Sequence, residues 1–286
     1  MSRRPIFIGG MFKSGTSLLR AMVGQHPKIA SGLETYWFDL DWSQRDGAGT
    51  EFRRRLHWLA NFYEFDREEV VAMAEASGSV YAFLTKFLDS FAARQGKIRW
   101  AEKTPGNIRH LDRIVTGWPD AQIVHIVRDP KDVFASLKQA KKWDSIEEFS
   151  ERWCAFFGGV EDFRTRLDLN AGRYIELRYE ALVHESVKTM RALFEFLGEE
   201  WSDDLADFRG NADDYNKVLS TTGKASTTLS RLSEPINTAR VGIWRDIVDD
   251  SEIRALRVAV SESGLLKLFE QIEDATPLAS AASRKI

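Results

Sequence analysis

The amino-acid sequence predicts an α/β fold in which helices flank a central parallel β-sheet. Three apolar segments of strand length are each followed by a helical pattern, and these segments are residues 6–8, 122–127 and 173–179. Strands that alternate with helices form parallel sheets, because a parallel neighbour is reached only through a long crossover, usually a helix. A chain of 286 residues can bury one large core, so we expect a single domain over residues 1–286.

The first strand–helix unit begins with the apolar run Ile6–Ile8 and turns at Gly9-Gly10. Apolar residues then recur at helical spacing over residues 17–23, until Pro27 ends the pattern. Further along, we expect a short strand at residues 28–31 and mostly helical structure over residues 47–95, with a break near residues 77–79.

The second unit carries the clearest strand pattern of the chain, at residues 122–127. Asp129-Pro130 follows, and these residue types are preferred at the N-cap and the first position of a helix. In the third unit, the alternating segment 173–179 precedes a helix through residues 190–197. Residues 211–237 are rich in Ser, Thr, Gly and Lys, and loops of this length are usually functional or disordered. We therefore predict a long loop at residues 211–237 that orders on ligand binding, and a frayed tail at residues 277–286.

Composition and charge disfavour several classes of protein. The net charge of −3 argues against nucleic-acid binding, because such domains usually carry a large excess of Lys and Arg. The single cysteine, Cys154, cannot form an intrachain disulfide, and no His/Cys cluster has the spacing of zinc ligands. No apolar run reaches about 18 residues, so no membrane span is expected. The first strand follows Arg3 and Arg4 too closely for a signal peptide, and we expect a cytoplasmic protein.

A glycine-rich loop lies between the first strand and its helix. Residues 10–17 match the phosphate-binding pattern G-x-x-x-x-G-K-[ST] at both glycines and at the final hydroxyl, but Thr16 stands at the lysine position and the lysine is Lys13. The backbone N–H groups of such a turn and the dipole of the following helix favour a phosphate or sulfate. A P-loop-type three-layer fold is therefore expected. The missing lysine, and Arg128 where a magnesium ligand would help, disfavour triphosphate chemistry. A bare glycine turn can also be only a tight connection.

Two blocks of sequence resemble the sulfotransferases that use 3′-phosphoadenosine 5′-phosphosulfate (PAPS), particularly the branch of tyrosylprotein sulfotransferases and related bacterial enzymes. The loop, its helix and His26-Pro27 look like that family's 5′-phosphosulfate site. The segment Val127–Pro130, followed by Ser136, is similar to its 3′-phosphate site. The resemblance spans residues 5–245. It implies that Lys13, Ser14, Gly15, Thr16 and Ser17 bind the 5′ end of the donor, and that Arg128 and Ser136 bind its 3′-phosphate.

Later segments resemble other parts of the same family. Glu34, by its distance from the loop, matches the catalytic glutamate. Lys103 lies in a segment similar to the one that supplies a lysine near the transferring sulfuryl group, and Tyr179 resembles the tyrosine on the adenine side. Near Trp244 the family pattern has a lysine where this chain has Ile243. Arg240 or Arg245 is expected to replace that lysine, and Ser230 is expected to be a further donor contact.

The resemblance implies transfer of a sulfuryl group from PAPS to an acceptor hydroxyl by in-line displacement, with adenosine 3′,5′-bisphosphate as product and no metal. Glu34 would be the base, Lys13 and Lys103 would bind the sulfuryl and phosphate oxygens, and the loop 211–237 would close over the donor. The acceptor can be a small molecule, a carbohydrate or a peptide tyrosine, and the oligomeric state stays open. Two alternatives are a P-loop kinase or nucleoside triphosphatase, and a non-catalytic binding protein on the same fold.

Overall fold

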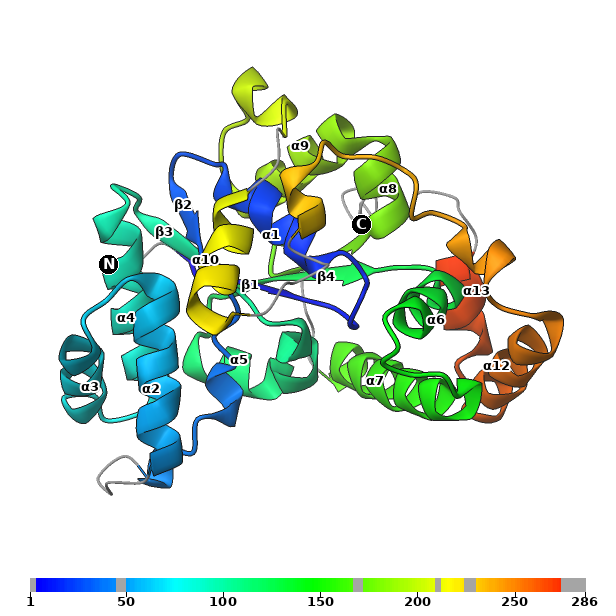
Figure 1. Ribbon diagram of the computed structural model, residues 1–286, viewed down its shortest axis with the longest axis horizontal. Helices are drawn as coiled ribbons and strands as arrows, with labels where there is room; N and C mark the ends of the chain where they lie inside the picture. The colour runs from blue at the N-terminus through cyan, green and yellow to red at the C-terminus, as the bar shows by residue number, and fades with distance from the viewer. Residues whose placement is uncertain (1–3, 45–49, 167–171, 209–211, 224–229, 274–286) are drawn as a thin grey trace. The chain divides into compact units, whose positions relative to one another are not determined.

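The centre of the structure, a computed structural model, is a parallel sheet of five strands in the order β2-β3-β1-β4-β5, flanked by helices (Figure 1). The model describes residues 4–44, 50–166, 172–208, 212–223 and 230–273. The predicted α/β class with a parallel sheet is confirmed. The strands are β1 (Ile6–Gly9), β2 (Ile29–Ser31), β3 (Arg99–Lys103), β4 (Gln122–Val127) and β5 (Tyr174–Arg178).

The chain packs into two compact units. The first consists of Met1–Ile8, Ser17–Gln122 and Asp207–Pro235, and the second consists of Gly9–Thr16, Ile123–Ala206 and Ile236–Ile286. The predicted single domain is not tested by this division. Within the described ranges, no helix is long and apolar enough to cross a membrane.

In the first unit, strands β2 and β1 pair on either side of β3, so that Ile8 lies opposite Lys103. Phe7, Trp100 and Trp118 pack ring against ring in its core. Ser79 caps the N-terminus of α4, because its hydroxyl accepts the N–H of Ala82 at 3.2 Å. The helices are α1 (Thr16–Gly24), which begins in the glycine loop, and α2 (Thr50–Tyr63), α3 (Arg67–Glu75), α4 (Val80–Arg94), α5 (Leu111–Gly117) and α10 (Ala212–Thr222).

The sequence predictions for this unit are largely confirmed. Strand β2 lies within residues 28–31, and helices α2 to α4 cover most of the described part of residues 47–95, with breaks at 64–66 and 76–79. The prediction of a loop throughout residues 211–237 is wrong, because α10 occupies residues 212–222 and packs on α2. Lys217 of α10 pairs with Glu64 at 2.7 Å. Residues 224–229 of that predicted loop lie outside the described ranges.

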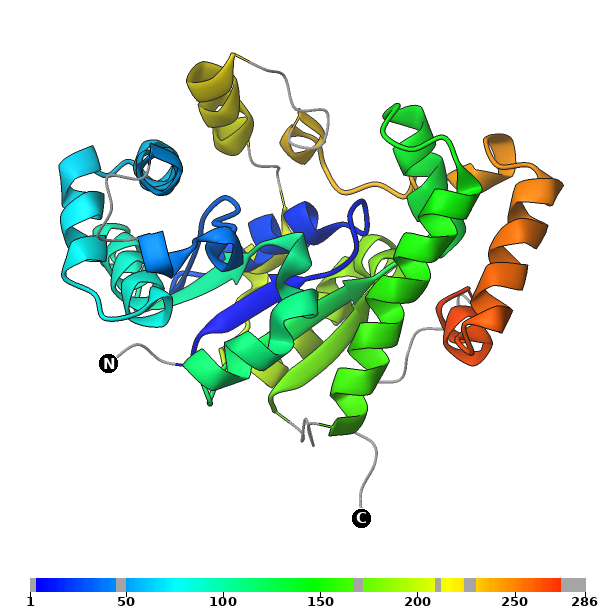
Figure 2. The ribbon, with the colours of Figure 1, turned by 90° about the horizontal axis from the view of Figure 1, so that it is seen from below.

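In the second unit, β4 and β5 pair in parallel, and the long helix α7 lies beside α12 (Figure 2). The carboxylate of Asp129 accepts the N–H of Lys131 at 2.9 Å, and Pro130 is the first residue of α6, which confirms the predicted helix start. Phe134, Trp153 and Phe269 belong to one buried cluster. The helices are α6 (Pro130–Gln139), α7 (Ile146–Arg166), α8 (Tyr179–His184), α9 (Ser186–Leu197), α12 (Asp250–Glu262) and α13 (Leu266–Glu273).

Short 3₁₀ turns connect several of these elements. The predicted frayed tail at residues 277–286 falls outside the described part of the chain. The turns are η1 (Trp37–Asp39), η2 (Trp42–Gln44), η3 (Pro105–His110), η4 (Asp203–Ala206), η5 (Arg231–Ser233) and η6 (Ile243–Asp246).

Candidate active site

The glycine loop of the second unit has a backbone that only glycine fits at two positions. A Cβ atom at Gly10 would lie under 3.0 Å from the carbonyl oxygen of Ile126, and one at Gly15 would lie under 3.0 Å from the ring of Tyr179. Gly15 also has a φ of +95°, which side chains rarely tolerate. Lys13 has a left-handed φ of 68°, and such strain in a non-glycine residue is typical of functional loops.

Arg128, at the end of β4, holds this loop. Its side chain is 4% exposed, and its Nη1 donates to the carbonyl oxygen of Lys13 at 2.8 Å. Nη2 donates to the carbonyl oxygen of Arg240, and the guanidinium lies 4.5 Å from the centre of the Tyr179 ring. The structure therefore brings four predicted donor-binding residues together. Among the described residues, the buried Nε of Arg128 has no hydrogen-bond partner, so one donor of this guanidinium is available to an anion.

Ser136 lies on α6, and Arg240 connects it to Arg128. The guanidinium of Arg240 donates to the hydroxyl of Ser136 at 3.2 Å and to the amide oxygen of Gln139 at 2.8 Å. Ser136 and Arg240, each predicted separately to bind the donor, are thus in contact. Together with Lys13, Arg128 and Tyr179, these residues form one polar group within the second unit, which we call the donor cluster.

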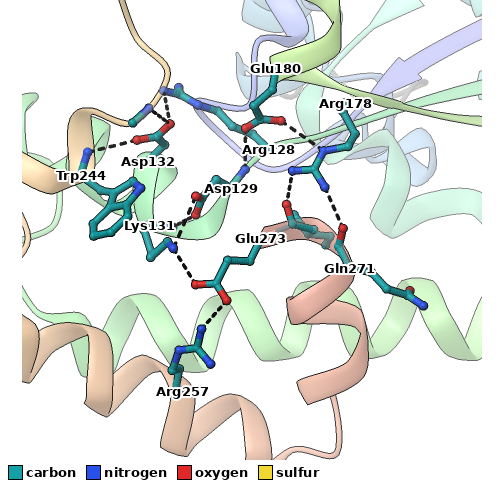
Figure 3. A network of polar contacts seen from close by, with 12 residues as sticks. Arg128, Asp129, Lys131, Asp132, Arg178, Glu180, Trp244, Arg257, Gln271 and Glu273 are labelled. Carbon is teal, nitrogen blue, oxygen red and sulfur yellow. Dashed lines mark hydrogen bonds and ion pairs between the residues drawn. The ribbon is translucent and has the colours of Figure 1, made fainter. Parts of the chain in front are cut away.

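Asp132 is a residue of this cluster that sequence reasoning missed. Its side chain is 1% exposed and lies 3.7 Å from Arg128. The same carboxylate accepts the backbone N–H groups of Gly242 at 2.8 Å and Trp244 at 3.1 Å (Figure 3). It therefore fixes the segment that carries Arg240. The only signal in the sequence is its place four residues after Arg128.

Ion pairs and hydrogen bonds anchor the start of α6 and the end of β5 to the last described helix (Figure 3). Lys131 pairs with Glu273 at 2.5 Å, and Arg178 donates to the carbonyl oxygen of Gln271 at 2.7 Å. Burial raises the pKa of Asp129 to about 6, although Lys131 opposes the shift. These contacts fix the start of α6, which carries Ser136, and the end of β5, which Tyr179 follows.

The first unit contains a buried ion pair. Lys103, the last residue of β3, places its Nζ 2.5 Å from Oε1 of Glu34 and 3.4 Å from the hydroxyl of Ser17. The Lys103 side chain is 3% exposed and that of Glu34 is 25% exposed. Since Ser17 follows Thr16 directly in the chain, the pair lies against the last residue of the glycine loop. Three further predicted site residues are therefore in contact.

The charges of this pair stabilise each other. Burial alone would raise the pKa of Glu34, but the ammonium of Lys103 and hydrogen bonds from Lys103 and Tyr36 outweigh burial, and the pKa is lowered. Burial lowers the pKa of Lys103, with Arg20 adding to the effect and Glu34 opposing it. Glu34 is thus ionised at neutral pH.

Tyr36 was missed by sequence reasoning, although it stands two residues after Glu34. Its hydroxyl donates to Oε2 of Glu34, and its backbone is left-handed with φ 49° and ψ 38°. Burial raises its pKa, and the Glu34 carboxylate raises it further. The phenol is therefore a fixed donor to the carboxylate. Ser230 lies in the first unit at the start of η5, and its predicted donor contact stays a prediction.

The described residues contain no group of three or more His, Cys, Asp or Glu side chains arranged to hold a metal ion. The glycine loop and the buried guanidinium of Arg128 lie in the second unit, and the ion pair of Lys103 with the ionised Glu34 lies in the first. The backbone N–H groups of a glycine loop at the start of a helix favour an anion.

The chain belongs to the sulfotransferase family, because the model of that family matches residues 5–203. It is 24% identical over 258 residues to the protein-tyrosine sulfotransferase of Drosophila melanogaster, covering 84% of this chain and 46% of that protein. It is also 24% identical to a putative protein-tyrosine sulfotransferase of Caenorhabditis briggsae, covering 88% of this chain and 84% of that one. A relative from Aquifex aeolicus, named as uncharacterized, is 26% identical and is covered over only 27% of its length.

Solved sulfotransferases share the fold. The sulfotransferase domain of the Synechococcus PCC 7002 olefin synthase superposes with a TM-score of 0.70 at 21% identity, covering 94% of this chain and 95% of that domain. Mouse sulfotransferase SULT7A1, solved in complex with PAP, has a TM-score of 0.55 at 15% identity, with 96% and 89% covered. The predicted family resemblance is confirmed.

Proposed function

We propose that the protein transfers the sulfuryl group of PAPS to a hydroxyl group of an acceptor. The observation that carries this proposal is the position of Arg128, whose buried guanidinium joins the backbone of Lys13 to that of Arg240. PAPS carries anionic groups at both its 5′ and 3′ positions, so its recognition needs two anion-binding groups. The glycine loop and the donor cluster provide them.

The residues present fit such a donor. The glycine loop leaves no room for a Cβ at Gly10 or Gly15, which is typical of a backbone cradle for phosphate. We assign the backbone N–H groups of residues 14–17 and the ammonium of Lys13 to the 5′-phosphosulfate. The free Nε of Arg128, the hydroxyl of Ser136 and the guanidinium of Arg240 are assigned to the 3′-phosphate, and Tyr179 to the adenine side.

Glu34 is the proposed general base. Because its pKa is lowered, it is ionised at neutral pH and can accept the proton of the acceptor hydroxyl. PAPS supplies an activated sulfuryl group, whose bond to the 5′-phosphate oxygen breaks as the bond to the acceptor oxygen forms, and the electron pair leaves on adenosine 3′,5′-bisphosphate. Lys103, which contacts both Glu34 and Ser17, stabilises the negative charge that develops.

The acceptor is proposed to be a small molecule, a carbohydrate or a peptide tyrosine. The relatives named as protein-tyrosine sulfotransferases support the last of these. The half-buried free thiol of Cys154 suits a reducing compartment, and we propose that the protein acts in the cytoplasm.

Calorimetric titration tests the donor. The protein is titrated with adenosine 3′,5′-bisphosphate and, separately, with ATP in the presence and absence of magnesium. We expect tight, magnesium-independent binding of the bisphosphate and weaker binding of ATP. Tighter binding of ATP that depends on magnesium would contradict the proposal and favour a kinase or triphosphatase.

A further inference from the structure

The residue that precedes Lys103 in the chain has a fully buried carboxylate. Glu102 has no exposed surface. Its Oε1 accepts the backbone N–H of Thr35 at 3.2 Å, the hydroxyl of Thr35 at 2.8 Å and the hydroxyl of Thr104 at 2.7 Å. Its Oε2 accepts the side-chain amide of Asn107 at 2.6 Å. Burial raises the pKa of this carboxyl, and the four neutral donors that converge on it oppose the shift.

The partners of Glu102 hold the chain around Glu34. Thr35 is the next residue after Glu34, so the two bonds from Thr35 fix the backbone that carries the base. The hydroxyl of Thr104 also accepts the N–H of Tyr36 at 3.2 Å, and the Tyr36 phenol donates to Glu34. Both oxygens of the base are therefore held by groups that this network positions.

The same network fixes the end of β3. The side-chain amide of Asn107 donates to the carbonyl oxygen of Ile8 at 2.9 Å, and Ile8 lies opposite Lys103 in the sheet. Since successive side chains of a strand point to opposite faces, Glu102 can be enclosed while Lys103 reaches Glu34. Burial lowers the pKa of Lys103, and Glu34 and, least of all, Glu102 oppose this shift.

We propose that Glu102 is a positioning residue for sulfuryl transfer, which holds Glu34 and Lys103 in register through Thr35, Thr104 and Asn107 without contacting substrate. The inference rests on the proposed function. Its physical basis is that a displacement of about 1 Å at a reacting group can cost roughly 100-fold in rate.

Replacement of the Glu102 carboxylate by an amide tests the positioning role without changing the volume of the side chain. Glu102→Gln keeps the shape, but only one of its two polar groups is an acceptor, so its NH₂ group would face a donor of the network. We expect kcat to fall by about 30- to 100-fold, while the Kd of adenosine 3′,5′-bisphosphate changes less than about threefold, because the donor cluster has other anchors. The rate is expressed per bisphosphate-binding site, which corrects for any unfolded protein.

The pH profile supplies a readout that a merely structural role would not move. In the wild type, protonation of Glu34 sets the acidic limb of kcat and deprotonation of Lys103 the alkaline limb. In Glu102→Gln, a looser ion pair raises the pKa of Glu34 and lowers that of Lys103, because each charge loses part of the stabilisation that the other provides. Arg20 and Tyr36 also face the pair and are unchanged. The acidic limb of kcat therefore moves to higher pH and the alkaline limb to lower pH, and the pH profile narrows.

Glu199→Gln is the matched control, since Glu199 is also a buried carboxylate but lies in the second unit, just after α9. Its kcat is expected to stay within about threefold of the wild type. Thr104→Val retains the carboxylate and removes two hydrogen bonds, so it should lower kcat and move both limbs inward. It carries the test if Glu102→Gln does not fold.

The outcomes separate this inference from the function on which it rests. A wild-type protein that binds the bisphosphate but transfers no sulfuryl group contradicts both. If the wild type is active and Glu102→Gln or Thr104→Val keeps the wild-type kcat per site and the wild-type pH profile, the positioning role is refuted and the proposed function stands.

Discussion

Replacement of Arg128 by alanine removes the contact at the centre of the donor cluster. The buried guanidinium donates to two carbonyl oxygens, those of Lys13 and Arg240, and lies 3.7 Å from the carboxylate of Asp132. Alanine would leave both carbonyl groups without this donor and Asp132 without its cation. Asp132 would keep the two backbone N–H groups that it accepts.

The expected loss of stability follows from this geometry. Breaking a buried ion pair by removing one partner costs about 3–5 kcal/mol. In domains of about 150–250 residues, each kcal/mol of lost stability lowers the Tm by about 2–4 °C. The Tm of Arg128→Ala should therefore fall by roughly 10 °C. Arg257→Ala is the control, because the Arg257 side chain is 43% exposed, and an exposed pair is worth about 1 kcal/mol or less.

The effect on ligand binding distinguishes the 3′-phosphate from the rest of the donor. Loss of a charge-assisted contact to phosphate costs up to about 3 kcal/mol, so adenosine 3′,5′-bisphosphate should bind roughly 100-fold more weakly to Arg128→Ala. Adenosine 5′-phosphate lacks the 3′-phosphate, so its affinity should fall only because the Lys13 loop is loosened. Its loss of affinity should be at least about tenfold smaller than that of the bisphosphate. Calorimetry at a temperature below both melting transitions measures both ligands. Equal losses for the two ligands would refute the assignment of Arg128 to the 3′-phosphate.

Three further changes test other parts of the site. Gly15→Ala places a methyl group against the Tyr179 ring in a backbone with φ +95°, so bisphosphate binding should weaken by about tenfold or more; unchanged affinity in a folded variant would show that the loop does not hold the donor. Lys103→Met removes the cation that lowers the pKa of Glu34, so the acidic limb of kcat should move to higher pH, and a limb that stays in place would exclude Glu34 as the titrating base. The pKa of Asp129 is raised to about 6, so its ionisation destabilises the fold as pH rises from about 4 to 6. Asp129→Asn keeps an N-cap oxygen, and its Tm should rise relative to that of the wild type between pH 4 and pH 7. A difference in Tm that stays constant over this range would argue against the raised pKa.

The strands and helices with clear apolar patterns were predictable from the sequence. Strand β4 and its capped helix are local features, since the apolar run and Asp129-Pro130 carry their own signals. Strand β3 was not predicted, because Arg99, Glu102 and Lys103 make it resemble an exposed segment. In the fold all three are buried, with hydrogen-bond partners far away in the chain that no local pattern reveals.

The site residues also differ in whether a local sequence pattern could predict them. The glycine loop is recognisable because its geometry depends on neighbouring residues, and Arg128 stands at a strand end. The contact of Lys103 with Glu34 spans 69 positions in the chain, and Asp132 reaches Gly242 over 110 positions. The family resemblance named Glu34 and Lys103 without their contact, and it gave no role to Asp132. Helix α10 was taken for a loop because it has few apolar residues, and of these Val218 is only partly buried and Leu219 is exposed.

Transfer of labelled sulfuryl from PAPS by the wild type and by Glu34→Gln tests the proposed function most directly. The assay uses a set of phenols, sugars and tyrosine peptides, and bisphosphate binding is measured on the same samples. We predict transfer to at least one hydroxyl acceptor by the wild type, and a loss of about 100-fold or more in Glu34→Gln with donor affinity nearly unchanged. Equal transfer by both proteins would contradict the role of Glu34, and bisphosphate binding without transfer to any acceptor would contradict the proposed activity.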